Sequence, residues 1–214
     1  MATQRKADSS GKESPTVLII TRHVLTDYNK NKIVQGSRSN TKPSVEGTEQ
    51  AKMLSKELLK YKIDVAYSSD LDRCRLTIEP FLKESKVPVH YTKELRERNY
   101  GIFDGAPAED YTKWKNDNNI QENFTVAPPE GESFKDIKKR VAKILTSILE
   151  KEKGKTILIC GHNASDVALL LALFNQKEEE HYKEYMLSNA SITIVEIVNG
   201  KPKVKVMNST KHLK

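Results

Sequence analysis

The chain is organised around one stretch, Val17-Leu18-Ile19-Ile20-Thr21-Arg22-His23-Val24-Leu25-Thr26-Asp27-Tyr28-Asn29. Its short run of aliphatic and β-branched residues is typical of a buried strand in a parallel sheet. Arg22 and His23 lie at the end of this run. Because ligands of open α/β sheets bind beyond the carboxyl ends of the strands, we expect Arg22 and His23 to belong to a binding site.

A second apolar run, Thr156-Ile157-Leu158-Ile159-Cys160, repeats this layout and ends in Gly161-His162-Asn163. The apolar segment from Ala164 to Phe174 follows it and is expected to form a buried helix. Two buried strands that each end in a histidine predict one active site formed by segments far apart in the sequence.

Helical and extended patterns alternate along the rest of the chain. We expect helices after the N-caps Ser44 and Ser133, short strands over 64–67 and 87–91, and a hairpin whose turn is Asn199-Gly200. Such alternation predicts an α/β fold. The expected form is a three-layer sandwich with a mostly parallel central sheet flanked by helices, a C-terminal antiparallel hairpin and a lid-like insertion.

Another helix is expected to begin after a cap formed by Ser68-Ser69-Asp70 and to run to about Glu84. Pro80 is expected to kink this helix or end it early. Arg73 lies in its first turn. An arginine in that position is commonly a solvated charge, or pairs with a nearby carboxylate such as that of Asp70 or Asp72.

The domain organisation predicted from composition is simple. Residues 1–15 are polar and aperiodic and are expected to be a disordered leader. Residues 16–214 are long enough for one domain with a sizeable core. Within this domain, the polar segment over about 106–130 is interpreted as a lid-like insertion with a short helix near 110–115.

Charge and cysteine content exclude several classes of function. The formal net charge of +7 comes from lysines interleaved with acidic residues, which is typical of a solvated surface or of a field that attracts small phosphorylated anions. We expect no nucleic-acid partner, because no basic stripe with interleaved aromatics is present. No apolar segment has the length of a membrane span. Cys74 and Cys160 lack metal spacing and favour a cytoplasmic setting, and neither a metal nor a cofactor is expected.

Phosphoryl transfer without a metal needs a particular set of groups, and the sequence offers each of them. Arginines can hold the phosphate dianion, a neutral imidazole can attack the phosphorus, and a carboxylic acid can protonate the departing oxygen. A second histidine can share the charge that develops on the phosphoryl oxygens. The candidates are Arg22 and Arg73 as the clamp, His23 and His162 as nucleophile and stabiliser, and Glu97 as the acid.

Each of these residues also has an ordinary structural explanation. An Arg-His dipeptide is common on surfaces, Glu97 stands between two arginines and could form a salt bridge, and His162 could be a satisfied core histidine. Their joint occurrence where an α/β sheet places its site favours the catalytic interpretation.

The pattern resembles the histidine phosphatases, also called the phosphoglycerate mutase-like superfamily. The resemblance covers nearly the whole chain after the leader, and its motifs occur in the same order as in the family. These motifs are Thr21-Arg22-His23 with Thr26 and Asn29, Gln35-Gly36, Ser44-Val45-Glu46-Gly47, Ser68-Ser69-Asp70-Leu71-Asp72-Arg73, Leu95-Arg96-Glu97-Arg98-Asn99-Tyr100-Gly101, Pro129-Glu130-Gly131-Glu132-Ser133, Gly161-His162, Ser188-Asn189-Ala190-Ser191-Ile192 and Asn208-Ser209-Thr210-Lys211-His212-Leu213.

The resemblance implies a role for each site residue. His23 would be phosphorylated, Glu97 would be the proton donor, and Arg22, Arg73 and His162 would form the phosphate pocket. The positions that would contact phosphate or substrate are Asn29, Gln35, Gly36, Tyr100 and Asn163, the last through its backbone N–H at a helix N-terminus.

Within the superfamily, Tyr28-Asn29, the stretch over 32–36 and the stretch from Glu97 to Ser133 look most like the TIGAR and fructose-2,6-bisphosphatase branch. The mutases carry an arginine pair in the insertion, where this chain has Tyr111-Thr112-Lys113-Trp114-Lys115. The chain departs from the usual pattern at Val24-Leu25, which replaces Gly-Glu, and at Asn163, which replaces glycine. Valine restricts the backbone beside the nucleophile, so these departures could lower activity.

Three functions follow as hypotheses. The first is a phosphomonoester hydrolase that acts through phosphohistidine on small phosphorylated metabolites such as sugar bisphosphates. The second is a catalytically weak relative that serves as a binding or regulatory module. The third is a mutase that moves phosphate between hydroxyl groups.

Overall fold

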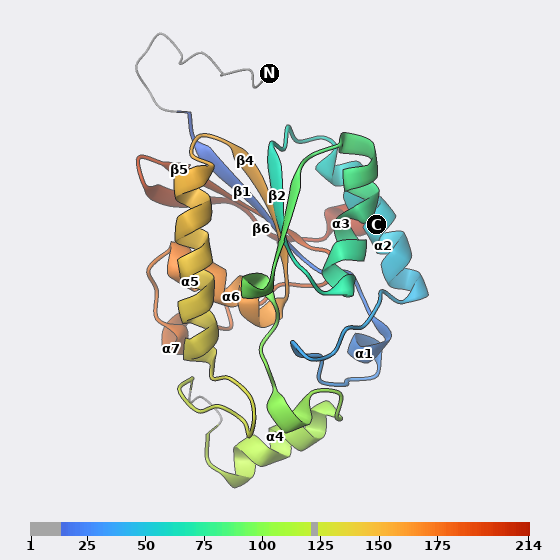
Figure 1. The fold of residues 1–214 in the computed structure, drawn as a ribbon, viewed down its shortest axis with the longest axis vertical. Helices are drawn as coiled ribbons and strands as arrows, with labels where there is room; N and C mark the ends of the chain where they lie inside the picture. Colours follow the sequence, from blue (N-terminus) through green and yellow to red (C-terminus); the bar gives the residue numbers. More distant parts are fainter. Residues whose placement is uncertain (1–13, 121–123) are drawn as a thin grey trace.

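The computed structural model describes residues 14–120 and 124–214, so the expected leader lies almost entirely outside the described residues. In the described part a six-stranded sheet has the order β3-β2-β4-β1-β5-β6 (Figure 1). Neighbours among the first four of these strands are parallel, whereas β5 and β6 are antiparallel. The strands are β1 (Thr16–Arg22), β2 (Val65–Ser69), β3 (Val89–Thr92), β4 (Thr156–Gly161), β5 (Ile192–Val198) and β6 (Lys201–Ser209).

Helices cover both faces of the sheet, with α5 and α6 on one face and α2 and α3 on the other (Figure 1). This arrangement confirms the predicted α/β fold with antiparallel C-terminal strands. The helices are α1 (Asp27–Lys30), α2 (Val45–Leu58), α3 (Asp72–Ser85), α4 (Ala108–Asp117), α5 (Phe134–Lys151), α6 (Asn163–Leu173) and α7 (Glu178–His181), with short 3-10 turns η1 (Lys93–Leu95), η2 (Gly101–Phe103) and η3 (Lys211–Leu213).

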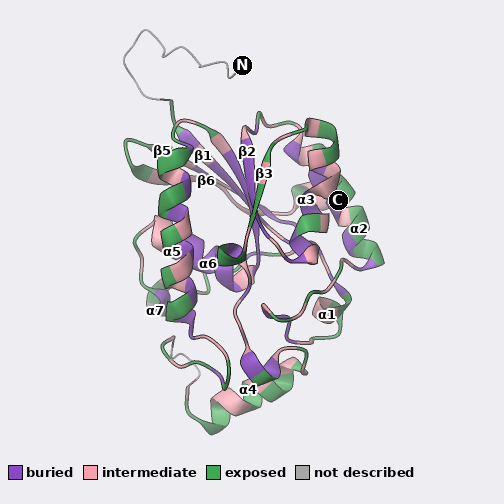
Figure 2. Ribbon diagram, in the orientation of Figure 1, coloured by how far each residue is buried: buried purple, intermediate pink, exposed green. Residues whose placement is uncertain are grey.

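The central strands contribute side chains to two hydrophobic cores, one on each face of the sheet, because successive side chains of a strand point to opposite faces. Leu18 and Ile20 of β1 pack with α5 and α6, whereas Ile19 packs with α2 and α3. In Figure 2 the central strands are accordingly buried along most of their length. The near-continuous apolar runs of β1 and β4 therefore reflect burial on both faces.

Two of the predicted helix starts are confirmed. The Ser44 hydroxyl accepts a hydrogen bond from the Gly47 N–H at 3.1 Å. Ser133 forms a capping box with Asp136, in which each side chain accepts from the other residue's backbone N–H. The predicted hairpin is also present, since Asn199 and Gly200 have φ values of 50° and 73° between β5 and β6.

Helix α3 ends at Ser85, close to the predicted Glu84, but the predictions for its N-cap and for an early end at Pro80 are wrong. Its N-cap residue is Leu71, whose side chain forms no capping hydrogen bond, because the Ser69 and Asp70 side chains serve tertiary contacts instead. Pro80 does not end the helix, which continues to Ser85. Ile78 and Phe81 on either side of Pro80 are buried, so packing maintains the helix beyond the missing N–H.

The insertion lies at one end of the molecule, away from the sheet (Figure 1). Its helix α4 is longer than the predicted 110–115 and begins at Ala108. The Ala108 N–H donates to the Lys32 carbonyl at 2.8 Å, and the Val34 N–H donates to the Ala106 carbonyl, also at 2.8 Å. These hydrogen bonds fix the base of the insertion to the loop that follows His23.

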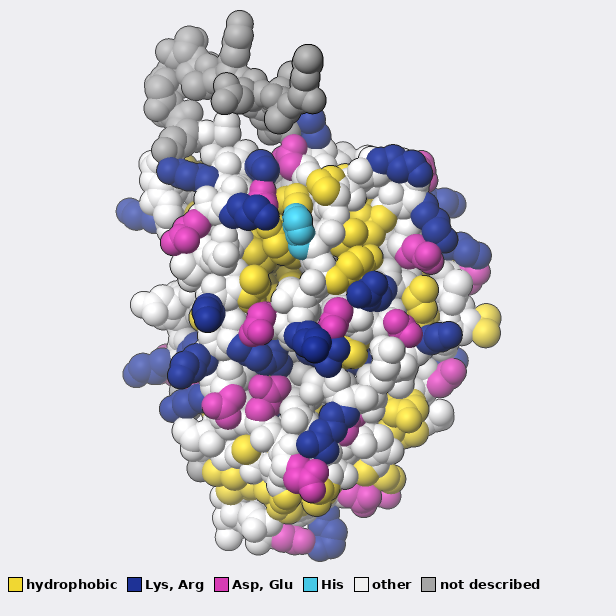
Figure 3. All heavy atoms as spheres, in the orientation of Figure 1, with side chains coloured by type: hydrophobic (Ala, Val, Ile, Leu, Met, Phe, Trp, Pro, Cys, Tyr) yellow, Lys and Arg dark blue, Asp and Glu magenta, His cyan; other side chains and the backbone are white. Residues whose placement is uncertain are grey.

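Charged side chains of both signs are mixed on the surface of the protein. On the face seen in Figure 3, lysine and arginine side chains alternate with carboxylates and form no single basic stripe. Within the part of the chain that the structure describes, no helix combines the length and the apolar character needed to cross a membrane.

Candidate active site

Strands β1 and β4 are adjacent and parallel, with Arg22 opposite Gly161. The His23 N–H donates to the Gly161 carbonyl at 3.0 Å, and the His23 and His162 ring centroids are 5.2 Å apart. The two histidines, 139 positions apart in the sequence, therefore meet at the carboxyl edge of the sheet. The ends of both strands thus lie side by side, which is the arrangement that one shared site requires.

His23 is held in one tautomer. A carbonyl only accepts, so the contact of 2.8 Å between Nδ1 and the Val24 carbonyl places the proton on Nδ1. Burial, followed by the charges of Arg73 and Arg22, holds the pKa of His23 well below its ordinary value. The imidazole is thus neutral near pH 7 and carries its lone pair on Nε2, which is the form a nucleophile needs.

His162 is buried beside His23 and is fixed by α3 and β2. The Arg73 guanidinium donates through Nε to Nδ1 at 3.0 Å, so the proton of the neutral ring lies on Nε2, which is 2.9 Å from the Ser69 hydroxyl. The Cys74 sulfur lies 3.4 Å from the same nitrogen. Burial, then Arg73 and the other neighbouring charges, keeps the pKa of His162 well below its ordinary value.

Arg73 is not paired with Asp70, whose carboxylate instead binds Arg96 at 2.6 and 2.7 Å. Besides His162, Arg73 donates to the Ser39 carbonyl at 2.6 Å and to the Gly36 carbonyl at 3.0 Å. A guanidinium has five N–H donors, and these contacts use three of them. The side chain is buried, so it presents a fixed cation with donors to spare.

Arg22 provides the second guanidinium. Its Nη1 donates to the Leu187 carbonyl at 2.7 Å. Its Nε is buried and has no partner among the described residues. Burial lowers the pKa of Arg22, and the nearby carboxyl groups of Glu97 and Asp166 raise it in part. An unpartnered buried N–H on a cation is a site at which a phosphate oxygen would replace lost hydration.

Glu97 completes the cluster from the segment after η1. Its Oε1 accepts from the Arg98 N–H at 2.8 Å and from the Ala164 N–H at 3.1 Å, in the first turn of α6. The carboxyl group is buried and interacts electrostatically with both Arg22 and Arg73. Glu97 is therefore not a surface residue in a salt bridge with its sequence neighbours Arg96 and Arg98, which was the structural alternative for this residue.

Three of the predicted substrate contacts have structural roles in this structure. The Asn29 side-chain oxygen Oδ1 takes part in the cap of α1 by accepting from the Thr26 N–H and hydroxyl at 3.3 and 3.0 Å. The Gln35 side chain also accepts from the Thr26 hydroxyl at 3.0 Å. Gly36 acts through its backbone, since its carbonyl binds Arg73 and its N–H donates to Asp104 at 2.9 Å. The substrate-binding assignments of these residues stay predictions.

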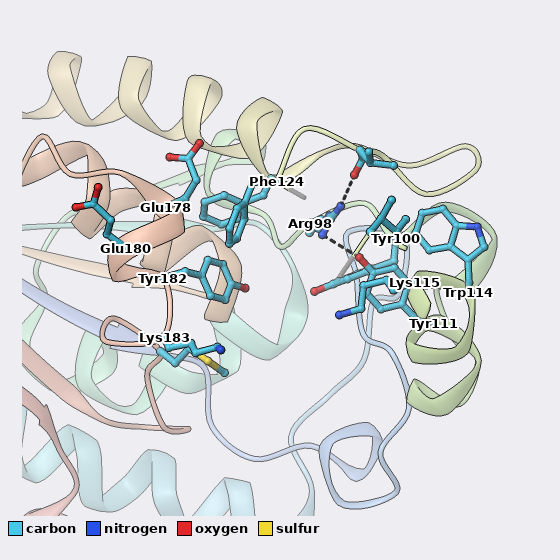
Figure 4. A pocket seen from close by; sticks show the side chains of 14 residues that line it. Arg98, Tyr100, Tyr111, Trp114, Lys115, Phe124, Glu178, Glu180, Tyr182 and Lys183 are labelled. Atoms are coloured by element: carbon cyan, nitrogen blue, oxygen red, sulfur yellow. Dashed lines mark hydrogen bonds between the residues drawn. The ribbon is translucent and has the colours of Figure 1, made fainter. Parts of the chain in front are cut away.

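The other two predicted contacts lie at the edge of the cluster. Asn163 is the first residue of α6, so its N–H has no acceptor within the helix. Its side-chain oxygen accepts from the Leu187 N–H at 3.3 Å. Tyr100 lines a cavity of about 370 Å³, together with Arg98, the residue that follows Glu97 (Figure 4).

Sequence reasoning missed several residues that hold the cluster together. Ser69 binds His162, whereas its place in the sequence predicts a helix cap. The Asn189 amide donates to the His23 carbonyl at 2.9 Å, a role that its motif could have indicated. Asp166 is buried within the first turns of α6, and burial raises the pKa of its carboxyl group well above the ordinary value. Nothing in the local sequence distinguishes Asp166 from a solvated helix residue.

Val24 stands where the family usually has glycine. Its backbone does not adopt the left-handed conformation, since Val24 is not among the described residues with positive φ. Its side chain packs with Ala51 and Ala190, and its N–H donates to the Thr77 hydroxyl at 2.9 Å. Close approach is required instead at Gly47, where a Cβ atom would lie 2.0 Å from the Leu25 carbonyl oxygen. Glycine at that position allows α2 to begin directly against the loop after His23.

The described residues contain no group of three or more His, Cys, Asp or Glu side chains able to hold a metal ion. The arrangement instead places two neutral imidazoles, two guanidinium groups and one carboxyl group together. Such a set can bind a phosphoryl group, attack it and protonate its leaving group.

The buried histidines predict a loss of stability in acid. Each is held neutral in the folded protein, whereas in the unfolded chain it titrates near its ordinary value of 6.5. Below that pH the unfolded chain binds more protons at these histidines, so their contribution to the free energy of unfolding falls by up to about 1.4 kcal/mol per pH unit for each. Asp166 contributes with the opposite sign, because its folded pKa is raised.

A variant isolates the histidine contribution. In His23→Gln, urea unfolding measured between pH 7 and pH 5 should show a weaker loss of stability in acid, by up to about 1.4 kcal/mol per pH unit. An unchanged dependence on pH would show that His23 is not held neutral.

The sequence profile of the histidine phosphatase superfamily (branch 1) matches residues 18–210. A phosphoglycerate mutase of Schizosaccharomyces pombe is 32% identical over 170 residues, which cover 75% of this chain and 80% of that protein. A broad-specificity phosphatase of Saccharomyces cerevisiae is 32% identical over 212 residues, 92% of this chain and 86% of that protein. The solved structure of YhfR from Bacillus stearothermophilus has a TM-score of 0.84 at 25% identity, covering 93% of this chain and 100% of that chain.

Proposed function

The chain belongs to the histidine phosphatase superfamily (branch 1), and we propose that it is a phosphomonoester hydrolase that works through a phosphohistidine intermediate. The observation that carries this proposal is the tautomer of His23. Its Nδ1–H is engaged by the Val24 carbonyl, so the basic nitrogen is Nε2, in a ring 5.2 Å from that of His162.

In the first step, the lone pair on His23 Nε2 attacks the phosphorus and the bond from phosphorus to the ester oxygen breaks. Glu97, as a carboxylic acid, gives its proton to that oxygen, and the alcohol leaves. In the second step, water attacks the phosphohistidine, Glu97 takes a proton from the water, and inorganic phosphate is released with restoration of neutral His23.

Arg22, Arg73 and His162 would stabilise the charge on the phosphoryl oxygens in both steps. The unpartnered Nε of Arg22 and the unused N–H donors of Arg73 support this role. Because the protein scaffold already fixes both guanidinium groups, they need little reorganisation when the phosphate binds.

The proposed substrates are small phosphorylated metabolites. Sugar bisphosphates are the class suggested by the resemblance of Tyr28-Asn29 and residues 32–36 to the TIGAR and fructose-2,6-bisphosphatase branch. The broad-specificity phosphatase relative supports a hydrolase that accepts several alcohols. The buried free thiols of Cys74 and Cys160 favour the reducing cytoplasm as the compartment.

A mutase is the second candidate, because a relative of 32% identity is named a phosphoglycerate mutase. A mutase would return the phosphate to a second hydroxyl group, whereas a hydrolase gives it to water. Helix α4 lacks an arginine pair, and Lys113 of this helix is paired with Asp117 at 2.6 Å. These features favour the hydrolase.

Release of phosphate separates the hypotheses. Incubation with p-nitrophenyl phosphate should yield nitrophenolate and stoichiometric inorganic phosphate. A panel of phosphorylated metabolites, sugar bisphosphates and 3-phosphoglycerate included, should release phosphate from at least one member. Isomerisation of phosphoglycerate without phosphate release would support the mutase. No turnover, together with no acid-labile phosphate on the protein, would support the binding module.

The family residues can be restored at Val24 and Leu25. We expect Val24→Gly with Leu25→Glu to give no large gain in kcat, because the Val24 backbone already makes its contacts with His23 and Thr77. Removing the buried valine side chain should lower the free energy of unfolding by about 2–4 kcal/mol. Steady-state kinetics and urea unfolding test both outcomes, and a large gain in kcat would show that these two residues restrain catalysis.

A further inference from the structure

The cavity beside Glu97 has walls rich in aromatic side chains, and we infer from them that the preferred substrates are phosphate monoesters whose alcohol carries an aromatic or heteroaromatic ring. This inference rests on the proposed hydrolase activity, and for the alcohol that the site releases it favours an aromatic ring over the sugar of the bisphosphates named above.

The position of the cavity makes it the place for the leaving group. Arg98, which lines it, directly follows the proposed proton donor Glu97, and the Arg98 backbone N–H donates to that carboxyl group. Tyr100 and Tyr182, which also line it, interact electrostatically with both Glu97 and Arg22. Since Glu97 protonates the ester oxygen, the rest of the alcohol extends past Glu97 into this cavity.

The shape and lining of the cavity fit a ring. Among the fourteen lining residues that the structure describes, six are aromatic, namely Tyr100, Tyr111, Trp114, Phe124, Phe134 and Tyr182. In Figure 4, Tyr182 and Phe124 lie across the cavity from Tyr100, Tyr111 and Trp114. An apolar cavity of ~150 Å³ takes up a benzene molecule, so about 370 Å³ accommodates a ring with substituents.

Two of the three cations among the described residues that line the cavity, Arg98 and Lys115, already contact its other wall residues, which disfavours a second anionic group as the main determinant. Arg98 donates to the Glu132 carbonyl at 2.8 Å, the Tyr111 hydroxyl at 2.9 Å and the Val126 carbonyl at 3.2 Å. Its guanidinium also lies 5.5 Å from the Tyr100 ring centre, and the Lys115 ammonium lies 5.3 Å from that of Tyr111. These contacts orient the rings as part of the wall.

Two tyrosine hydroxyls offer hydrogen bonds to the edge of a bound ring. Burial raises the pKa of Tyr100 well above its ordinary value and that of Tyr182 to about 12, so both stay protonated. Within the described part of the chain, neither hydroxyl has a hydrogen-bond partner, and both point toward the space between the two walls (Figure 4). A ring that carries nitrogen or oxygen at its edge would satisfy them.

The test compares three alkyl phosphates whose alcohols are similarly poor leaving groups, namely benzyl, cyclohexylmethyl and ethyl phosphate. We expect kcat/KM for benzyl phosphate to exceed that for ethyl phosphate by about 10-fold to 100-fold, as stacking on aromatic side chains typically gives. It should also exceed that for cyclohexylmethyl phosphate, which has the same size but no aromatic face. Trp114→Leu should reduce the preference for benzyl phosphate severalfold, whereas Tyr91→Leu, on strand β3 away from the cavity, should preserve it.

The outcomes distinguish this inference from the proposed function. Hydrolysis of all three esters with equal kcat/KM would overturn the aromatic class and leave the hydrolase intact. The aromatic class would also be overturned, and the hydrolase left intact, if kcat/KM for fructose 2,6-bisphosphate exceeded that for benzyl phosphate. An unchanged preference of Trp114→Leu for benzyl phosphate would have the same consequence. Failure to release phosphate from these esters, from p-nitrophenyl phosphate and from the whole metabolite panel, together with no acid-labile phosphate on the protein, would overturn the proposed function itself.

Discussion

Replacement of His23 by alanine should lower kcat/KM for p-nitrophenyl phosphate by at least about 10⁴-fold, the size of effect seen when a covalent nucleophile is removed. The neutral ring with its lone pair on Nε2 is the group in the cluster best prepared to attack phosphorus. His162 cannot replace it, because its Nδ1 accepts from Arg73 and its Nε2 is engaged by Ser69.

The measurement needs two readouts and a matched control. Rapid quenching of the wild type with labelled substrate should trap a phosphate that is stable in base and labile in acid, and the His23→Ala variant should trap none. His90→Ala removes an exposed histidine on β3, where its ring contacts Tyr67, and should retain wild-type turnover. Turnover by His23→Ala near the wild-type rate would exclude His23 as the nucleophile.

Much of the fold could be predicted because its signals are local. The runs of apolar residues in β1 and β4 need two covered faces, and the stripe on α5 needs one. The placement of Arg22, His23 and His162 followed from a rule about strand ends. For these residues, chain position and spatial position are linked by regular secondary structure.

The rest depended on contacts that the local sequence does not encode. Ser69 and Asp70 have the side chains of helix caps, yet they bind His162 and Arg96, residues far away in the sequence. Pro80 remains inside α3 because buried neighbours hold the helix. The protonation of each imidazole also became clear only when its partners, the Val24 carbonyl and the Arg73 guanidinium, were placed.

These contacts explain how two arginines and two histidines coexist in one buried cluster. Both imidazoles are neutral, so the two guanidinium groups are its only fixed cations among the residues described, and Glu97 lies beside them. Bound phosphate would add negative charge where N–H donors are unused. The free site thus has an excess of hydrogen-bond donors that a phosphoryl group would satisfy.

Replacement of Glu97 by glutamine should have the second largest effect, and its size should depend on the leaving group. Glutamine keeps the shape of the side chain but has no proton to give to the ester oxygen. An alkyl phosphate needs that proton, so we expect kcat/KM to fall by about 10²–10⁴-fold. Nitrophenolate leaves readily without protonation, so the loss for p-nitrophenyl phosphate should be smaller.

The dependence on leaving group separates proton donation from a structural role. Glu97 also accepts hydrogen bonds from the Arg98 and Ala164 backbone N–H groups, which the glutamine carbonyl oxygen can still accept. Damage to that structure would slow both substrates alike, because both use the same phosphate pocket. Glu94→Gln, an exposed carboxylate in the adjacent turn η1, should slow neither. Equal losses for the two substrates in Glu97→Gln would therefore assign Glu97 to positioning α6 and leave the proton donor to be sought elsewhere in the cluster.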